Sequence, residues 1–140
     1  MITCTRRLQF CAGHRVFRHE SKCHNIHGHN YVVEIKAVAS ELDSLGRVID
    51  FSVIKEIMGA WIEENWDHGF LVYASDTVAR DMLLKLGTKT YVMESNPTAE
   101  NMAIYLHALG NKLLAQDEVR VLSVVVHETE NCWAESVDGQ

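Results

Sequence analysis

A long alternating stretch near the N-terminus places the strongest constraint on the fold of this chain. Its alternate residues form an apolar set (Tyr31, Val33, Ile35, Ala37) and a mixed set (Val32, Glu34, Lys36, Val38). Alternation with a period of two is typical of a β-strand that packs one face against a core. Residues 3–11 are also β-prone. The sequence therefore predicts two long early strands, separated by an irregular segment over residues 12–26.

The middle of the chain predicts a helix and several shorter elements. Apolar residues recur at helical spacing after Asp50 and Ser52, and either of these can cap a helix of about four turns. A short strand, a short helix that ends near Gly87 and a further β-prone run follow, at 69–73, 76–86 and 88–94.

The C-terminal third predicts one more helix and a buried strand. Asn96 or Thr98 can cap the helix, and Pro97 suits its first turn. Residues 118–128 are apolar on both faces near their end, as in a central strand. Strands and helices are mixed without strict alternation of strand and helix, which favours an α+β fold with helices packed on one face of a sheet.

Composition narrows the class of protein. The chain of 140 residues carries 47% hydrophobic residues and a net charge of −6, which is typical of one globular domain over residues 1–140. Scattered basic residues in an acidic chain argue against a nucleic-acid partner. No run of 18 apolar residues and no secretory signal is found, so we expect a cytoplasmic protein with no membrane partner. In that compartment we expect the cysteines to be reduced thiols, and we interpret Cys4, Cys11 and Cys132 as structural.

Histidines crowd around the start of the second long strand, in the stretch KCHNIHGHNY. Residues two apart in a strand share a face and lie about 6.6 Å apart, so His27 and His29 can reach one metal ion. His14 is the best third candidate, because it follows the first strand and the small residues before it permit close approach of the backbone. By residue type alone, His19 and His24 remain alternative candidates for the third metal ligand.

Cys23 decides which kind of metal site this is. Three imidazoles with a fourth position left open are typical of a catalytic zinc ion, whereas Cys23 as a fourth ligand would complete a closed structural site. A free thiolate beside the ion would instead be a base or a nucleophile. The spacing alone leaves these alternatives open.

Six motifs now stand in order along the chain: FCAGH, KCHNIHGHNY, VIDFSVIKE, WDHGFL, NPTAEN and VVVHETENCWAE. In this combination the chain resembles the 6-pyruvoyltetrahydropterin synthase / 6-carboxytetrahydropterin synthase family over nearly its whole length. The resemblance implies the tunnelling fold, an antiparallel four-stranded sheet with helices packed on one face. It also implies a homo-oligomer, expected to be a hexamer, that forms a barrel with active sites at subunit interfaces.

The resemblance further implies roles for individual residues. It makes Zn²⁺ the cofactor and His14, His27 and His29 the metal ligands. It makes the catalytic residues Cys23, Asp67 and His68, with the thiol and the Asp-His pair facing each other across a subunit boundary. A carboxylate next to an imidazole can fix the tautomer of the ring, which is useful in an acid or base.

Substrate contacts are expected from the resemblance and from chemistry. Glu128 matches the family's pterin anchor, and its two oxygens suit the adjacent N–H donors of a pterin ring. Thr98 and Thr129 are further candidates for hydrogen bonds to that ring. The basic residues around the histidines can serve the triphosphate of the substrate; they are Arg15, Arg18 and Lys22.

The spacing of three residues between Cys23 and His27 resembles that of the bacterial 6-carboxytetrahydropterin branch, which belongs to queuosine and 7-deazapurine biosynthesis. That branch implies a carbon–carbon lyase acting on 7,8-dihydroneopterin triphosphate. Two alternatives are kept. One is the pyruvoyl branch, which eliminates triphosphate without carbon–carbon cleavage, and the other is a non-catalytic zinc-binding module with Cys23 as a ligand.

Overall fold

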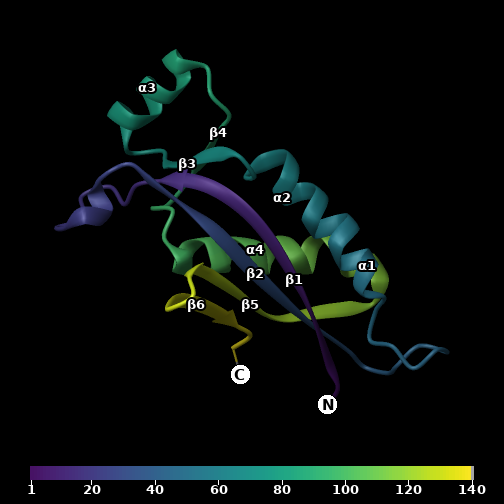
Figure 1. Ribbon diagram of the computed structural model, residues 1–140. Coiled ribbons are helices and arrows are strands. Elements are labelled where there is room, and N and C mark those ends of the chain that lie inside the picture. The colour runs from purple at the N-terminus through teal and green to yellow at the C-terminus, as the bar shows by residue number, and fades with distance from the viewer. Residues whose placement is uncertain (140) are drawn as a thin grey trace.

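In the computed structural model, which describes residues 1–139, a curved sheet carries helices on one face (Figure 1). Within these residues the sheet has six strands in the order β4-β3-β1-β2-β5-β6. The strands are β1 (Thr3–His14), β2 (His27–Ala39), β3 (Gly69–Tyr73), β4 (Thr90–Met93), β5 (Val119–Thr129) and β6 (Cys132–Val137). The helices are α1 (Phe51–Ile54), α2 (Ala60–Asn65), α3 (Thr77–Leu86) and α4 (Ala99–Leu113). The expected α+β class is confirmed.

The centre of the sheet is antiparallel, as expected. Strand β1 pairs with β2 from Thr3↔Val38 to His14↔His27, and β2 pairs in turn with β5. This register places the last residue of β1 directly opposite the first residue of β2. Two histidines therefore meet at one end of the sheet.

The prediction of a four-stranded antiparallel sheet is wrong, because the sheet has six strands of mixed direction. Strand β1 continues past residue 11 to His14, and β3 pairs in parallel with this extension. Strand β4 then pairs in parallel with β3. The strand β6 was also missed; it folds back on β5 through a tight turn after Thr129.

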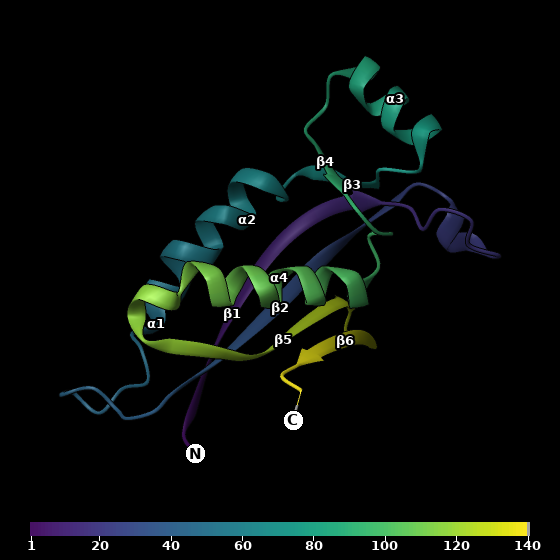
Figure 2. The same cartoon turned by 180° about the vertical axis from the view of Figure 1, so that it is seen from behind.

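The core lies between the sheet and the helices, on the face predicted from the alternation of residues 31–37. Figure 2 shows α1, α2 and α4 lying along the same side of β1, β2 and β5. The largest fully buried side chains of this core come from both layers: Trp66, Tyr31, Ile35, Ile54, Met58, Leu71, Met102, Leu106 and Leu114. The other face of β1, β2 and β5 carries no helix within residues 1–139 (Figures 1 and 2), whereas α3 packs on that face of β3, against Val72.

The first long helix is interrupted by one wider turn. Asp50 caps α1 by accepting a hydrogen bond from the backbone N–H of Ser52, which settles the choice between the two candidates. A π-helical turn over Lys55–Gly59 then joins α1 to α2. The expected helix of about four turns is therefore present, with a change of hydrogen-bonding pattern in its middle.

The second long helix, α4, begins at Ala99, two residues later than a first helical residue at Pro97 would indicate. Thr98 is the N-cap and accepts a hydrogen bond from the N–H of Asn101. Pro97 precedes the cap instead of lying in the first turn, so that its carbonyl points away from the helix. This carbonyl becomes part of the site described below.

The short helix α3 sits at one end of the molecule with a small core of its own. Asp76 caps it, and Gly87 ends it in the left-handed conformation at φ 74°, as the sequence predicts. Its buried residues pack with β3 in a second cluster, formed by Val72, Ala79 and Leu83. Within residues 1–139, no helix combines the length and the apolar character that crossing a membrane requires.

Candidate metal centre and active site

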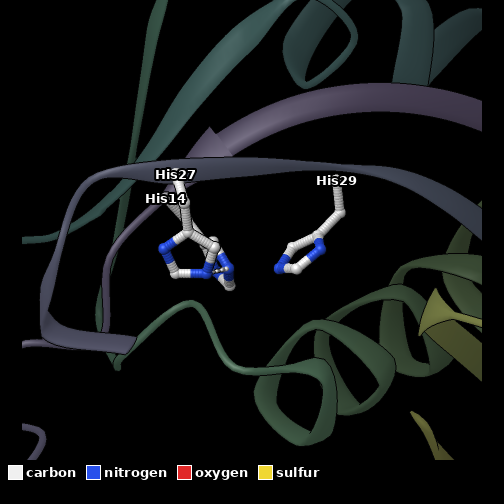
Figure 3. Close-up of side chains that lie close together, drawn as sticks. All are labelled: His14, His27 and His29. Atoms are coloured by element: carbon white, nitrogen blue, oxygen red, sulfur yellow. Dashed lines mark hydrogen bonds between the residues drawn. The ribbon is translucent and has the colours of Figure 1, made fainter. Parts of the chain in front are cut away.

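Three imidazoles converge at the end of the sheet where β1 stops and β2 starts. Figure 3 shows His14, His27 and His29 pointing to the same side of the sheet, toward the segment that leads into α4. The Nε2 atoms of His14 and His27 lie 3.1 Å apart. One ring nitrogen from each of the three residues falls within 4.8 Å of the other two. The structure thus brings together the three predicted ligands.

Main-chain carbonyls fix two of these rings. His14 Nδ1 lies 2.6 Å from the carbonyl oxygen of Pro97, and His27 Nδ1 lies 2.7 Å from that of Asn25. A carbonyl can only accept, so each Nδ1 carries the proton and donates it. Each Nε2 of the neutral ring is then a lone-pair nitrogen, and two lone pairs face each other at 3.1 Å. This arrangement suits a cation between them, and carbonyl-anchored imidazoles are typical of metal ligands.

Burial favours the neutral form of two of the three imidazoles, those of His14 and His29. His14 is 1% exposed, and burial lowers its pKa from 6.5 to about 4. Burial also lowers the pKa of His29, although the charge of Glu128 opposes the shift. Among residues 1–139 the buried Nε2 of His29 has no hydrogen-bond partner. Three converging imidazoles, one with an orphaned nitrogen, fit a divalent cation that accepts nitrogen ligands.

Two glycines allow the strands to approach at the cluster. Gly13 and Gly28 are opposite each other in the β1–β2 register. A Cβ on Gly28 would lie 3.1 Å from the carbonyl oxygen of Ala12, and one on Gly13 would lie 2.8 Å from the ring of Phe70. The expectation that small residues permit close approach here is therefore confirmed.

Cys23 lies in a short 3-10 turn, Lys22–His24, in the loop between β1 and β2. Its carbonyl accepts a hydrogen bond from the N–H of Val16, and its side chain is half-buried. Neither group of potential metal ligands in residues 1–139 includes its sulfur. The rivals His19 and His24 are likewise outside these groups.

Asp67 and His68 form a close pair just before β3. Asp67 Oδ2 lies 2.9 Å from His68 Nδ1, which fixes the proton on that nitrogen and leaves Nε2 free. His68 adopts the left-handed conformation at φ 58°, and its side chain is 77% exposed. Its backbone N–H donates to the carbonyl of Cys11 at 2.7 Å.

Cys11, which the sequence led us to interpret as structural, is a third member of this group. Its Sγ lies 3.6 Å from His68 Nε2, and its N–H donates to Asp67 Oδ1 at 3.1 Å. The signal was in the sequence. Leu8, Phe10 and Ala12 share the core face of β1, so residue 11 must point to the opposite face.

The metal cluster and the Asp67–His68 pair occupy opposite faces of the sheet. His14 has the parity of the buried residues of β1, whereas Cys11, the contact of His68, has the other parity. Within one chain the Asp-His pair therefore does not face the three-histidine cluster.

Glu128, at the end of β5, links the cluster to two surface grooves. Its Oε2 lies 4.0 Å from His29 Nε2. One groove, of about 370 Å³, is lined by Glu128 with residues that include Ala99, Asn131 and Trp133. The other, of about 470 Å³, is lined by Glu128 and Thr129 together with the backbone region of His29.

The remaining predicted contacts have defined positions. Thr98 caps α4, and the Thr129 hydroxyl accepts from the N–H of Asn131 in the β5–β6 turn, so both oxygens already hold backbone groups. Arg15 is bound to the carboxylate of Asp76 through two hydrogen bonds, of 2.6 and 2.5 Å. Two of the five N–H donors of Arg15 are therefore engaged in an internal ion pair.

Comparison with known proteins agrees with these observations. The family model described as 6-pyruvoyl tetrahydropterin synthase matches residues 3–138. A Rickettsia conorii protein named 6-carboxy-5,6,7,8-tetrahydropterin synthase is 43% identical over 137 residues, which cover 96% of this chain and 99% of that protein. A Helicobacter pylori protein of the same name is 36% identical over 142 residues, with coverages of 94% and 70%.

Solved structures share the fold. An uncharacterized protein from Wolinella succinogenes matches with a TM-score of 0.87 at 22% identity, covering 99% of this chain and 98% of that chain. The 6-pyruvoyl tetrahydropterin synthase of Caenorhabditis elegans matches with a TM-score of 0.71 at 24% identity, with coverages of 99% and 96%. Since the family model spans nearly the whole sequence and the bacterial relatives are similar along the same length, the chain belongs to the 6-pyruvoyl tetrahydropterin synthase family.

Proposed function

We propose that this chain is a zinc-dependent lyase that converts 7,8-dihydroneopterin triphosphate to 6-carboxy-5,6,7,8-tetrahydropterin. Acetaldehyde and triphosphate would be released, in queuosine and 7-deazapurine biosynthesis. The names of the curated relatives support the 6-carboxy product. The observation that carries the proposal is the convergence of three imidazoles whose Nε2 atoms have no hydrogen-bond partner outside the cluster within residues 1–139.

His14, His27 and His29 would hold the zinc ion, and three protein ligands leave a fourth position for the substrate. Zinc, when bound, supplies a Lewis acid that makes a nearby hydroxyl of the substrate side chain easier to deprotonate. The Nδ1 contacts to Pro97 and Asn25 keep the rings aimed at the ion. Burial of His14 keeps water from competing for its nitrogen.

Glu128 would orient the pterin. Its carboxylate stands at the rim of a groove and 4.0 Å from a proposed zinc ligand, so a ring bound to it would place its side chain beside the metal. The two carboxylate oxygens match two adjacent N–H donors of the pterin. The exposed indole of Trp133 lines the same groove and offers a flat apolar surface.

Cys23, Asp67 and His68 would move the protons. His68 presents its free Nε2 as an acid or base while Asp67 holds Nδ1, and Cys23 serves as a second proton carrier at the carbons of the substrate side chain. Because the Asp-His pair lies on the other face of the sheet from the histidine cluster, it would act on the substrate held by a neighbouring copy. This supports a homo-oligomer, with the hexamer expected from the family resemblance.

The proposal is tested by loading the purified chain with zinc and incubating it with 7,8-dihydroneopterin triphosphate. We expect consumption of the substrate with one acetaldehyde per turnover, measured by derivatisation and chromatography. Consumption without acetaldehyde would support the pyruvoyl branch instead.

Replacing Cys23 separates an enzyme from a non-catalytic zinc module. If Cys23 is a catalytic thiol, Cys23→Ala abolishes turnover while the zinc content stays at about one per chain. If Cys23 is a fourth ligand, the same change sharply weakens zinc binding, and the enzymatic proposal fails. Atomic absorption after dialysis against a weak chelator gives the answer.

A further inference from the structure

Cys11 belongs to a linear array of thiol, imidazole and carboxylate that the three-histidine cluster does not include. The Sγ of Cys11 lies 3.6 Å from His68 Nε2, and His68 Nδ1 lies 2.9 Å from Asp67 Oδ2. The carboxylate fixes the imidazole proton on Nδ1, so Nε2 presents a lone pair to the thiol. The geometry is that of a thiol beside a base that is itself oriented by a third group.

Backbone contacts hold this array together from both strands. The N–H of Cys11 donates to Asp67 Oδ1 at 3.1 Å, and the N–H of His68 donates to the carbonyl of Cys11 at 2.7 Å. His68 has a left-handed backbone at φ 58°, a conformation that is uncommon for residues other than glycine. The approach of sulfur to nitrogen is therefore built into the β1–β3 junction.

A small molecule can reach the sulfur. Cys11 and His68 line a groove of about 420 Å³ on the open face of the sheet, and its other lining residues include Gly13, Gly28 and Asn30. Gly13 and Gly28 contribute no side chain to block the floor. His68 is 77% exposed, so the groove is open from the side of the base.

We propose that Cys11 is a covalent modification site, a nucleophilic thiol activated by His68 that takes small soft electrophiles and peroxides. The thiol proton passes to His68 Nε2, and the sulfur attacks the electrophile. With a haloacetamide, a carbon–sulfur bond forms, the halide leaves and the proton is later lost to water. With hydrogen peroxide, the sulfur is oxidised to a sulfenic acid as the O–O bond breaks, and the departing hydroxide takes the proton from His68 to give water.

The other cysteines provide internal references. Cys132 is exposed at the start of β6, and Cys4 is half-buried, with its pKa raised by burial. No hydrogen bond links either thiol to a histidine within residues 1–139. Cys11 is less exposed than Cys132, so simple accessibility predicts slower modification of Cys11 and the array predicts faster modification.

The test is a time course of iodoacetamide alkylation on the zinc-loaded full-length chain, resolved for each cysteine by peptide mass spectrometry. We expect Cys11 to react at least about fivefold faster than Cys132. In a His68→Asn variant the Cys11 rate should fall at least about fivefold, with Cys132 unchanged. Asparagine tolerates the left-handed backbone of position 68, so the β1–β3 junction is retained.

A matched control is His19→Asn, a histidine outside the array, which should leave the Cys11 rate unchanged. An Asp67→Asn variant gives a second measure. Loss of the carboxylate should lower the alkylation rate of Cys11, and this result does not depend on whether replacement of His68 disturbs the local structure. The proposal is overturned if Cys11 reacts no faster than Cys132, or if Cys11 keeps its rate in both His68→Asn and Asp67→Asn. Turnover is not the readout, so this inference stands or falls separately from the proposed pterin chemistry.

Discussion

His14 and His27 each bind a main-chain carbonyl through Nδ1, at 2.6 and 2.7 Å, and each keeps Nε2 for the centre of the cluster. His29 contributes a buried Nε2 for which residues 1–139 offer no partner. In water-free surroundings an unsatisfied nitrogen is costly. At the scale of single residues, the cluster is therefore more favourable with a cation than without one.

Removal of one imidazole should abolish tight metal binding. For His29→Ala we expect zinc affinity to fall more than about 100-fold, because two nitrogen ligands cannot replace three. Competition with a chromophoric chelator measures the affinity. His19→Ala is the matched control, since His19 lies in the loop between β1 and β2 and outside the cluster, and this variant should bind zinc as the unchanged chain does. Equal affinities of the two variants would contradict the assignment.

The three histidines of the cluster could be predicted from the sequence better than the groups that contact them. The period of two places His27 and His29 on one face, and the end of the preceding strand indicates His14. The carbonyl partners at Pro97 and Asn25 have no side-chain signature, so no pattern of residue types reveals them. The neighbours of Cys11 are apolar, and only the parity of the strand indicates that its side chain lies on the face opposite to the core.

At the scale of elements, the spacing of β1 and β2 sets the geometry of the cluster. Gly28 lies between two of the proposed ligands, and a Cβ there would approach the carbonyl oxygen of Ala12 to 3.1 Å. The backbone cannot move away without shifting His27 or His29 as well.

Gly28→Ala should therefore weaken zinc binding by about tenfold without loss of any ligand. The free energy of unfolding should fall by about 1–2 kcal/mol, because the strands must separate slightly. Gly59→Ala serves as the control, since its Cβ would meet only ordinary contacts, at 3.6 Å or more, and it should leave zinc affinity unchanged. Chelator competition and urea unfolding give the two quantities, and an undiminished zinc affinity in Gly28→Ala would show that strand spacing does not matter here.

The α3 unit depends on the ion pair between Arg15 and Asp76. Asp76 is 1% exposed, and hydrogen bonds from Arg15 lower the pKa of its carboxyl group. A carboxylate whose pKa is lower in the folded state stabilises the fold above its unfolded pKa, and this contribution is lost as pH falls through the folded value. We expect α3 to loosen in acid, below about pH 4.

Asp76→Asn should reproduce that loss at neutral pH, lowering the free energy of unfolding by about 2 kcal/mol because Arg15 loses its charged partner. Asparagine still caps the helix, so the effect reports the ion pair. Asp81→Asn, on the exposed side of α3, should change stability by less than about 0.5 kcal/mol. Denaturant unfolding and amide exchange in α3 are the measurements, and equal effects of the two variants would refute the role of the pair.

Most elements were predictable because their signals are local. Alternation predicted β2, β-prone composition predicted β1, helical spacing predicted α4, and Asp50 and Gly87 marked real boundaries. The parallel pairing of β3 with the end of β1 joins segments more than 50 residues apart, and no local pattern encodes it. The strand β6 was missed because its residues are mostly exposed and lack the apolar set that reveals a buried strand.

At the scale of the whole molecule, the sheet separates two chemical groups. The histidine cluster lies on the helix-covered face, and the Cys11–Asp67–His68 array lies on the open face. Under the proposed function, a complete site needs the cluster of one copy and the array of another.

This arrangement predicts complementation between inactive variants. Cys23→Ala and His68→Asn should each be inactive alone, but mixed oligomers made by co-expression should regain about one quarter of the wild-type activity, because that fraction of randomly paired sites combines an intact thiol with an intact histidine. Acetaldehyde release measures the recovery. Co-expressed Cys23→Ala and Cys23→Ser chains are the control and should stay inactive. Absence of recovery in verified mixed oligomers would mean that each chain builds its site alone.

The partners of the two anchored imidazoles have an evolutionary consequence. Both are carbonyl oxygens of the polypeptide backbone, so no amino-acid replacement at position 25 or 97 can delete them. The orientation of both rings therefore depends on the path of the backbone. Side chains at positions 25 and 97 can change in related sequences while the two imidazoles keep their orientation.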